Sequence, residues 1–139
     1  MINKILVPVD GSKNSEKGLK YACWLANKVG GTITVLYVVP VPFAGESAAF
    51  PLEPLENVGQ MIINNAKKIL RNEKCLDADF VLRYGSDNAG HEIIKFGEEN
   101  NISLIVMSAK GHSVLKHLLL GSVSDRVSKH ASCPVLIVK

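Results

Sequence analysis

The sequence has few cysteines and no cysteine motif of the kind that builds a metal site or a disulfide scaffold. Its three cysteines, Cys23, Cys75 and Cys133, are far apart in the chain and form no CxxC pair. An odd number of widely spaced cysteines argues against a disulfide framework or a zinc site and is typical of a reducing compartment. We therefore expect a cytoplasmic protein in which Cys23 and Cys133 are small core residues.

Long hydrophobic runs and a leader segment are also missing. The most apolar stretch, residues 32–43, contains Pro40 and Pro42 and is too short to cross a bilayer. Met1 leads directly into a strand-like segment, without the charged and apolar regions of a signal peptide. These features predict no contact with a membrane.

The sequence also lacks a large excess of either positive or negative charge. Lys and Arg number 16 and Asp and Glu 13, so the net charge is +3, and no run of five basic residues occurs. Nucleic-acid binding usually requires a concentrated basic patch, and the sequence therefore predicts no nucleic-acid partner. The 139 residues, 47% of them hydrophobic, suffice for one globular domain over residues 1–139.

Two common nucleotide-binding motifs are absent. The first turn, residues 10–13, has a single glycine and lacks the GxGxxG fingerprint of dinucleotide-binding proteins. Residues 85–90 have the glycine spacing of a Walker A loop, but His91 and Glu92 stand where that loop needs lysine and a hydroxyl residue. We interpret this segment as a turn with a helix cap at Asp87.

What the sequence does contain is a regular alternation of β-rich and helical segments. The expected strands are residues 5–9, 32–39, 78–84, 102–107 and 134–138. The expected helices run from a cap among residues 12–15 to Gly30, over 55–71, from Asp87 to Asn100, and over 122–131. Because each crossover between parallel strands needs about a helix's length, this order predicts an α/β fold with a five-stranded parallel sheet and helices on both faces.

Apolar residues three or four positions apart define the expected buried faces of the helices. These faces are Leu19, Ala22, Cys23, Ala26 and Val29 in the first helix, Val58, Ile62, Ala66, Ile69 and Leu70 in the second, and Ile93, Ile94, Phe96 and Gly97 in the third.

Ligands of parallel α/β sheets bind beyond the carboxyl ends of the strands, where the strand order reverses. The segments that follow the expected strands are therefore the candidates, above all residues 108–123. Small residues at Ser108, Gly111 and Gly121 allow backbone N–H groups to approach a phosphate, and the helix that starts near Gly121 adds further donors. The alternative is a glycine-bearing loop beside an apolar dimer face.

This segment resembles the nucleotide loop of the universal stress protein family, GxxG followed by nine residues and then G-[ST]. Gly111, residues 112–120 and the pair Gly121-Ser122 have that spacing, and the resemblance extends to residues 4–12, 36–38, 104–107 and 133–138. It implies a Rossmann-like fold of the adenine nucleotide alpha hydrolase type, ATP as ligand, and Mg²⁺ or Mn²⁺ held mainly by the phosphates.

The resemblance also implies a set of ATP-binding residues. Pro8 and Asp10 would border the adenosine, Val38 would pack on adenine, and the remaining contacts would come from Met107, Ser108, Lys110, Gly111, His112, Ser113, Val114, Gly121, Ser122 and Val123.

Ser108 replaces the family's first loop glycine. If that position requires a left-handed backbone, serine is unfavourable there; if it requires only a small residue, the hydroxyl can donate a hydrogen bond. Asp10 alone would also suit a turn or helix cap.

Three functional hypotheses remain open at this stage. The first is a regulatory ATP-binding protein of the stress response, and the second is a slow ATPase, for which Asp10, His112 and Lys110 are weak candidates and no catalytic residue is assigned. The third is a nucleotide-free homodimeric module.

The resemblance implies antiparallel pairing of residues Pro134–Val138 in a homodimer, whereas Lys139 could instead mask that edge. The long proline-containing loop over residues 40–54 is a candidate lid by its length and position.

Overall fold

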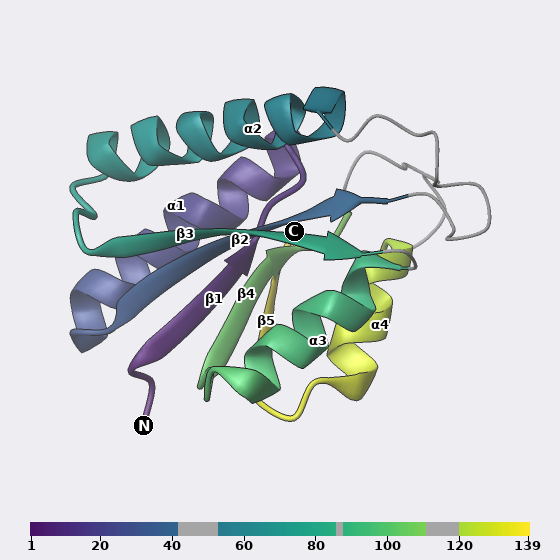
Figure 1. The fold of residues 1–139 in the computed structure, drawn as a ribbon. Coiled ribbons are helices and arrows are strands. Elements are labelled where there is room, and N and C mark those ends of the chain that lie inside the picture. The colour runs from purple at the N-terminus through teal and green to yellow at the C-terminus, as the bar shows by residue number, and fades with distance from the viewer. Residues whose placement is uncertain (42–52, 86–87, 111–119) are drawn as a thin grey trace.

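A computed structural model of the chain describes residues 1–41, 53–85, 88–110 and 120–139. Strands and helices alternate along the whole length (Figure 1). In chain order they are β1 (Lys4–Pro8), α1 (Lys13–Val29), β2 (Thr32–Pro40), α2 (Glu53–Asn72), β3 (Ala78–Gly85), α3 (Ala89–Glu99), β4 (Leu104–Ser108), α4 (Ser122–His130) and β5 (Val135–Val138). In the described ranges no helix combines the length and the apolar character that crossing a membrane requires.

The five strands form one parallel sheet in the order β3-β2-β1-β4-β5, which confirms the predicted fold class. From the central β1 the chain moves outward through β2 and β3, and then returns to add β4 and β5 on the other side. Helices α1 and α2 cover one face of the sheet, and α3 and α4 cover the other (Figure 1). The strand order therefore reverses between β1 and β4, the position where such sheets bind ligands.

Two hydrophobic clusters fill the spaces above and below the sheet. Ile5 and Val7 of β1 belong to the cluster beneath α1 and α2, whereas Leu6 belongs to the cluster beneath α3 and α4. All three side chains are fully buried. Successive residues of a strand point to opposite faces, so a strand covered on both faces is apolar throughout. This explains the continuous apolar strands of the sequence.

Local capping sets the ends of α1. Ser12 is the N-cap, and its Oγ accepts a hydrogen bond from the backbone N–H of Ser15 at 3.2 Å. Gly30 ends the helix in the left-handed conformation, with φ of 75°. Both ends lie where the sequence predicts them, because side-chain caps and left-handed glycines are local signals.

The caps of α3 differ from the prediction. Its N-cap is Asn88, whose side chain accepts a hydrogen bond from the N–H of Gly90 at 2.7 Å. The predicted cap, Asp87, lies outside the described residues. Asp and Asn cap helices equally well, so sequence alone does not discriminate between these neighbours.

Two of the predicted helix faces need correction. Val29 is 44% exposed, since α1 ends there, and Val58 is 47% exposed. In α2 the buried positions are Gly59, Ile63, Ala66 and Leu70, so the predictions for Ala66 and Leu70 are confirmed. Gly59 and Ile63 were not predicted, and the predicted Ile62 and Ile69 are half-buried against the core. A Cβ on Gly59 would lie 3.1 Å from Leu82 and 3.2 Å from Tyr37, so the helix packs closely at a residue with no hydrophobic signal.

Candidate functional site

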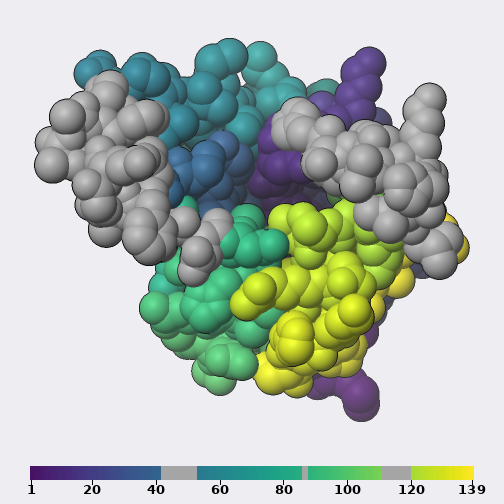
Figure 2. Space-filling view, turned by 90° about the vertical axis from the view of Figure 1, so that its right-hand side faces the viewer, coloured from purple at the N-terminus to yellow at the C-terminus, as the bar shows by residue number. Residues whose placement is uncertain are grey.

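A pocket of about 160 Å³ opens at the carboxyl ends of β1 and β4, where the strand order reverses. Figure 2 faces this end of the sheet, with the purple N-terminal chain set back between blue β2 and the yellow-green chain that leads into α4. The lining residues come from four separate parts of the sequence: 8–15, 36–38, 89–93 and 107–124.

Most of the site residues predicted from sequence line this one pocket. They are Pro8, Asp10, Val38, Met107, Ser108, Gly121, Ser122 and Val123. Lys110 is half-buried and is not one of the described lining residues. Gly111, His112, Ser113 and Val114 lie outside the described residues.

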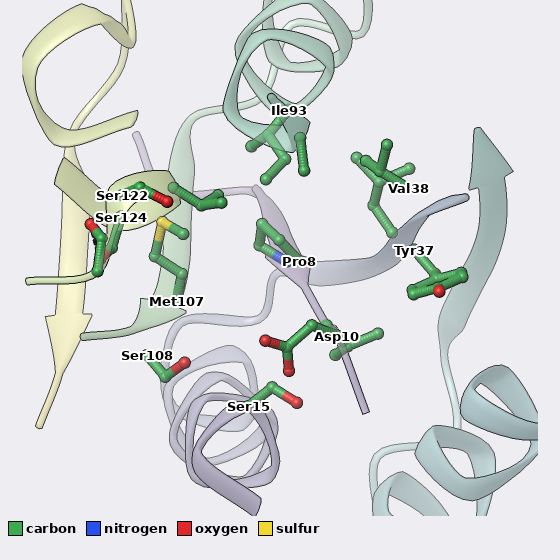
Figure 3. A pocket seen from close by; sticks show the side chains of 15 residues that line it. Pro8, Asp10, Ser15, Tyr37, Val38, Ile93, Met107, Ser108, Ser122 and Ser124 are labelled. Carbon is green, nitrogen blue, oxygen red and sulfur yellow. Dashed lines mark hydrogen bonds between the residues drawn. The ribbon is translucent and has the colours of Figure 1, made fainter. Parts of the chain in front are cut away.

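One side of the pocket is apolar. Val38 at the end of β2 and Ile93 of α3 lie across the opening from α1 (Figure 3). Leu36, Met107 and Val123 complete this wall. Ile93, Leu36 and Met107 are otherwise buried in the cluster beneath α3 and α4, so the wall continues the core and is held firmly in place. Such a surface suits a flat, weakly polar group.

The backbone of Val38 faces the β1 side of the sheet. Val9 donates a backbone hydrogen bond to the carbonyl of Leu36 at 2.9 Å, so the polar groups of Leu36 point toward β1. Those of Val38, two residues further, point the same way, because backbone groups alternate along a strand. The register of β1 with β2 ends at the pair Pro8 and Leu36. Val38 therefore directs one N–H and one C=O toward the pocket, beyond the last paired residue of β1.

The opposite side of the pocket is polar. Asp10, Ser15 and Ser108 gather there, next to the first turn of α1 (Figure 3). An Oδ1 atom of Asp10 accepts a hydrogen bond from the N–H of Ser12 at 2.8 Å. The hydroxyl of Ser15, only 4% exposed, donates to the carbonyl of Ser12 at 2.9 Å. Asp10 thus supports the cap of α1 and also lines the pocket.

Ser108 is the last residue of β4, and its backbone is extended rather than left-handed. Among the described residues other than glycine, only Lys74 and Asn101 have positive φ. The hydroxyl of Ser108 donates a hydrogen bond to the carbonyl of Lys110 at 3.1 Å. Ser108 therefore has a backbone conformation that serine adopts without strain.

The start of α4 presents backbone donors to the pocket. Its N-cap is Gly121, which has no side chain to accept a hydrogen bond from the first turn. Gly121 itself donates to the carbonyl of Ala109 at 2.7 Å, which fixes the helix start beside the end of β4. The N–H groups of the first turn, at Ser122 and Val123, have no partner within the helix. Together with the helix dipole they form a favourable position for an anion.

Tyr37 completes the pocket beside Asp10. The side chain is 9% exposed, and burial, together with the negative charge of Asp10, raises the pKa of the Tyr37 phenol. The phenol therefore stays neutral at physiological pH.

Comparison with known sequences identifies the family of this chain. The sequence model of the universal stress protein family matches residues 1–139. The universal stress protein YxiE of Bacillus subtilis is 35% identical over 155 aligned positions, and the match covers 100% of both chains. This chain belongs to the universal stress protein family.

Solved structures of universal stress proteins have the same fold. UspA from Lactobacillus plantarum superposes with a TM-score of 0.76 at 26% identity, over 99% of this chain and 98% of that one. A universal stress protein from Archaeoglobus fulgidus, solved in complex with dAMP, superposes with a TM-score of 0.76 at 23% identity, over 100% of both chains. At 23% identity, the likeness to the dAMP-bound protein establishes a shared fold and nothing further.

Sequence reasoning missed part of the pocket of this universal stress protein. The missed lining residues are Val9, Ser15, Leu36, Tyr37, Ala89, Ile93 and Ser124. Val9, Leu36 and Tyr37 lie next to predicted residues in the same strands, so the strand ends contained a signal for them. Ile93 was predicted only as a core residue of its helix, and nothing in its spacing indicates that it reaches a ligand pocket.

Proposed function

We propose that this universal stress protein binds ATP in the pocket between the ends of β1 and β4, as a regulatory nucleotide-binding protein of the stress response. The observation that carries the proposal is the division of the pocket into an apolar wall, a polar side with one carboxylate, and a helix N-terminus. These three parts match the base, sugar and phosphates of a nucleotide in chemical character.

The base would lie against the apolar wall. A planar adenine suits the side chains of Val38 and Ile93, and its edge carries adjacent donor and acceptor atoms. The N–H and C=O of Val38, directed toward the pocket beyond the β1 pairing, are complementary to such an edge. Backbone recognition of this kind favours one base over another without a polar side chain.

The sugar and phosphates would lie between the polar side and α4. The carboxylate of Asp10 can accept a hydrogen bond from a ribose hydroxyl. The phosphates would approach Gly121, Ser122 and Val123, where backbone donors and the helix dipole favour negative charge. Residues 108–114, including Lys110, would wrap the remaining phosphate oxygens. We propose that Mg²⁺ or Mn²⁺ accompanies ATP and is held mainly by phosphates and water.

The dAMP complex of the Archaeoglobus fulgidus relative makes adenine nucleotides the first ligands to test. That protein and this one share the fold, and the pocket of this chain has an adenine-compatible wall of its own. ATP, ADP, AMP and GTP should be compared in one experiment.

Isothermal titration of ATP with Mg²⁺ into nucleotide-free protein tests the proposal. We expect micromolar binding by the wild type and a loss of at least tenfold in Gly121→Asp. Aspartate is a favourable N-cap, so α4 should persist while the added negative charge repels phosphate. Gly121→Asn is the matched control, since it adds nearly the same volume without charge and should weaken binding less.

A contrary outcome is equally informative. If no nucleotide binds, and Ser108→Gly does not restore binding, the protein would be a nucleotide-free dimeric module. If ATP binds and phosphate is released at a rate that Gly121→Asp abolishes, the protein would be a slow ATPase. Phosphate release that survives this substitution would come from a contaminant.

We also propose that β5 pairs with its counterpart in a second copy to form a homodimer. The sheet order puts β5 at an edge, and its four apolar residues, Val135–Val138, are all half-buried. An apolar edge strand with unpaired backbone groups is suited to pairing with another chain.

A further inference from the structure

Two cysteines that are distant in the sequence lie in the same buried cluster. Cys23 is on α1, and Cys75 follows α2 in the turn that leads to β3. Both belong to the cluster between the sheet and helices α1 and α2, and they are 1% and 8% exposed. Both are free thiols, and neither lines the pocket. The pair is therefore a separate chemical feature of the molecule.

The thiol of Cys23 lies next to the turn that holds Cys75. The Cys75 side chain is among the groups that raise the pKa of the Cys23 thiol, and both residues belong to the same cluster. The Sγ atom of Cys23 also donates to the backbone carbonyl of Glu73 at 3.4 Å and accepts from Nδ2 of Asn27 at 3.8 Å. The Cys23 thiol thus lies in a small polar group of atoms within an otherwise apolar cluster.

The turn after α2 fixes the direction of Cys75. Its N–H donates to the carbonyl of Leu70 at 2.8 Å, and the N–H of Lys74 donates to that of Arg71 at 3.1 Å. Lys74 has φ of 61°, so the turn is a left-handed helix C-cap of the Schellman type. In this motif the residue at the position of Cys75 folds back onto the helix and its neighbours. Backbone hydrogen bonds therefore fix Cys75 in the cluster that also contains Cys23.

We propose that Cys23 and Cys75 form an intramolecular disulfide when the protein reacts with a hydroperoxide. With hydrogen peroxide, the Cys75 sulfur attacks one oxygen, the O–O bond breaks, and Cys75 becomes a sulfenic acid with release of one water. Cys23 then attacks the Cys75 sulfur, the S–O bond breaks, and the hydroxyl leaves with the Cys23 proton as a second water. In total, two thiols are oxidised and one peroxide is reduced to two waters.

The surroundings of each thiol set the order of these steps. Burial, and to a smaller extent the neighbouring Cys75 side chain, raises the pKa of the Cys23 thiol to about 12. Since a thiolate is the nucleophile toward peroxide, Cys23 is a poor first reactant. Cys75 is the more exposed of the two and lies in a surface turn, so it meets peroxide first. Cys23 is then the resolving thiol, because its attack on the sulfenic acid of Cys75 is intramolecular and its proton passes to the departing hydroxyl as the bond forms.

Thiol counting on the full chain tests the proposal. The reduced protein is treated with hydrogen peroxide, denatured, alkylated with iodoacetamide and analysed by mass spectrometry. We expect the number of free thiols to fall from three to one, with Cys133 as the thiol that remains. A peptide containing Cys23 should be linked to one containing Cys75, and dithiothreitol should reverse the link.

Alanine variants provide the controls. Cys23→Ala and Cys75→Ala should each prevent the link, whereas Cys133→Ala should oxidise as the wild type does. Alanine keeps helix propensity and adds no polar group to the core, and thermal unfolding of the reduced variants verifies their fold. Oxidised wild type should unfold roughly 5–10 °C higher than reduced wild type, because a cross-link that closes a loop of about fifty residues restricts the unfolded chain.

Several results would overturn the proposal. One is an unchanged thiol count at a peroxide dose that fully oxidises free glutathione. Another is over-oxidation of Cys75 to a sulfinic acid while Cys23 stays a thiol. A third is a link confined to Cys133 and between chains, seen as a dimer on a non-reducing gel.

Discussion

Gly30 and Gly97 are both associated with helices, but they have different backbone conformations. Gly30 follows α1 with φ of 75°, a region that side chains with a Cβ rarely adopt. Gly97 lies within α3, where a Cβ would be 3.8 Å from the nearest atom, Cδ1 of Ile105. Glycine is required by the backbone at the first position only. Ser108, at the extended end of β4, belongs with the positions where the backbone does not require glycine.

Alanine should therefore have opposite effects at these two positions. We expect Gly30→Ala to lower the free energy of unfolding by about 1 kcal/mol, because a left-handed backbone is strained for alanine. Gly97→Ala should raise it by about 0.5–1 kcal/mol, since alanine favours the helix and fits the space. Urea denaturation followed by circular dichroism measures both, and shifts of the same sign would contradict this explanation.

At the scale of elements, an ion-pair group joins β3 to α3. Nη2 of Arg83 is 2.7 Å from Oε2 of Glu99 and its Nε is 3.9 Å from a carboxylate oxygen of Glu92. The hydrogen bond from Arg83, helped by its charge and by that of Lys95, lowers the pKa of the Glu99 carboxyl. A lowered carboxyl pKa contributes stability above the pKa of the unfolded chain, and the contribution is lost as pH falls through the folded pKa.

Removing Arg83 should release the Glu99 carboxyl. In Arg83→Gln we expect the pKa of Glu99 to rise toward the ordinary value of about 4.3. The carboxyl carbon chemical shift of Glu99, followed by NMR as a function of pH, measures the change. Lys129→Gln, which removes the ion pair with Asp125 on α4, is the control and should leave Glu99 unchanged. A Glu99 titration that Arg83→Gln does not move would refute the assigned cause.

The ends of helices and strands could be predicted from sequence where local residues determine them. They could be predicted less well where tertiary packing determines them. The predicted strands agree with β1, β2 and β3 to within one residue at each end, whereas β4 begins at Leu104, two residues later than predicted. The buried face of α2 was predicted correctly at Ala66 and Leu70 but not at Gly59, which is buried although it carries no side chain. The sequence contains no signal for residues that are close in space but distant in the chain. It predicts Cys23 and Ile93 as core residues, but not that Cys75 shares a cluster with Cys23 or that Ile93 lines the pocket.

At the scale of the whole molecule, the outer edge of β5 would make the contact in the proposed homodimer. Ile105 donates to the carbonyl of Pro134, and Ala109 to that of Val138, so even-numbered residues of β5 point their backbone groups toward β4. Those of Val135 and Ile137 consequently point outward. Any second strand that extends the sheet must bond to these two residues.

Proline at Ile137 should separate dimer formation from folding. Ile137→Pro removes an outward N–H without removing a donor to β4, and edge strands tolerate proline. We expect this variant to be monomeric by light scattering while its circular dichroism spectrum is retained. Ile137→Ala keeps the N–H and is the matched control, which should remain largely dimeric. A folded Ile137→Pro dimer would show that β5 is not the interface.

The position of β1 in the sheet has a consequence for the growing chain on the ribosome. Strand β1 is made first, but β4, its neighbour on one side, is made about a hundred residues later, and the N–H of Asn3 bonds to the Ser103 hydroxyl across that gap. Until β4 emerges from the ribosome, the hydrogen-bonding edge of β1 that will pair with β4 stays exposed. The same edge borders the pocket. Co-translational folding can therefore complete the β1-β2-β3 half early, but the pocket is complete only when the last quarter of the protein has been synthesised.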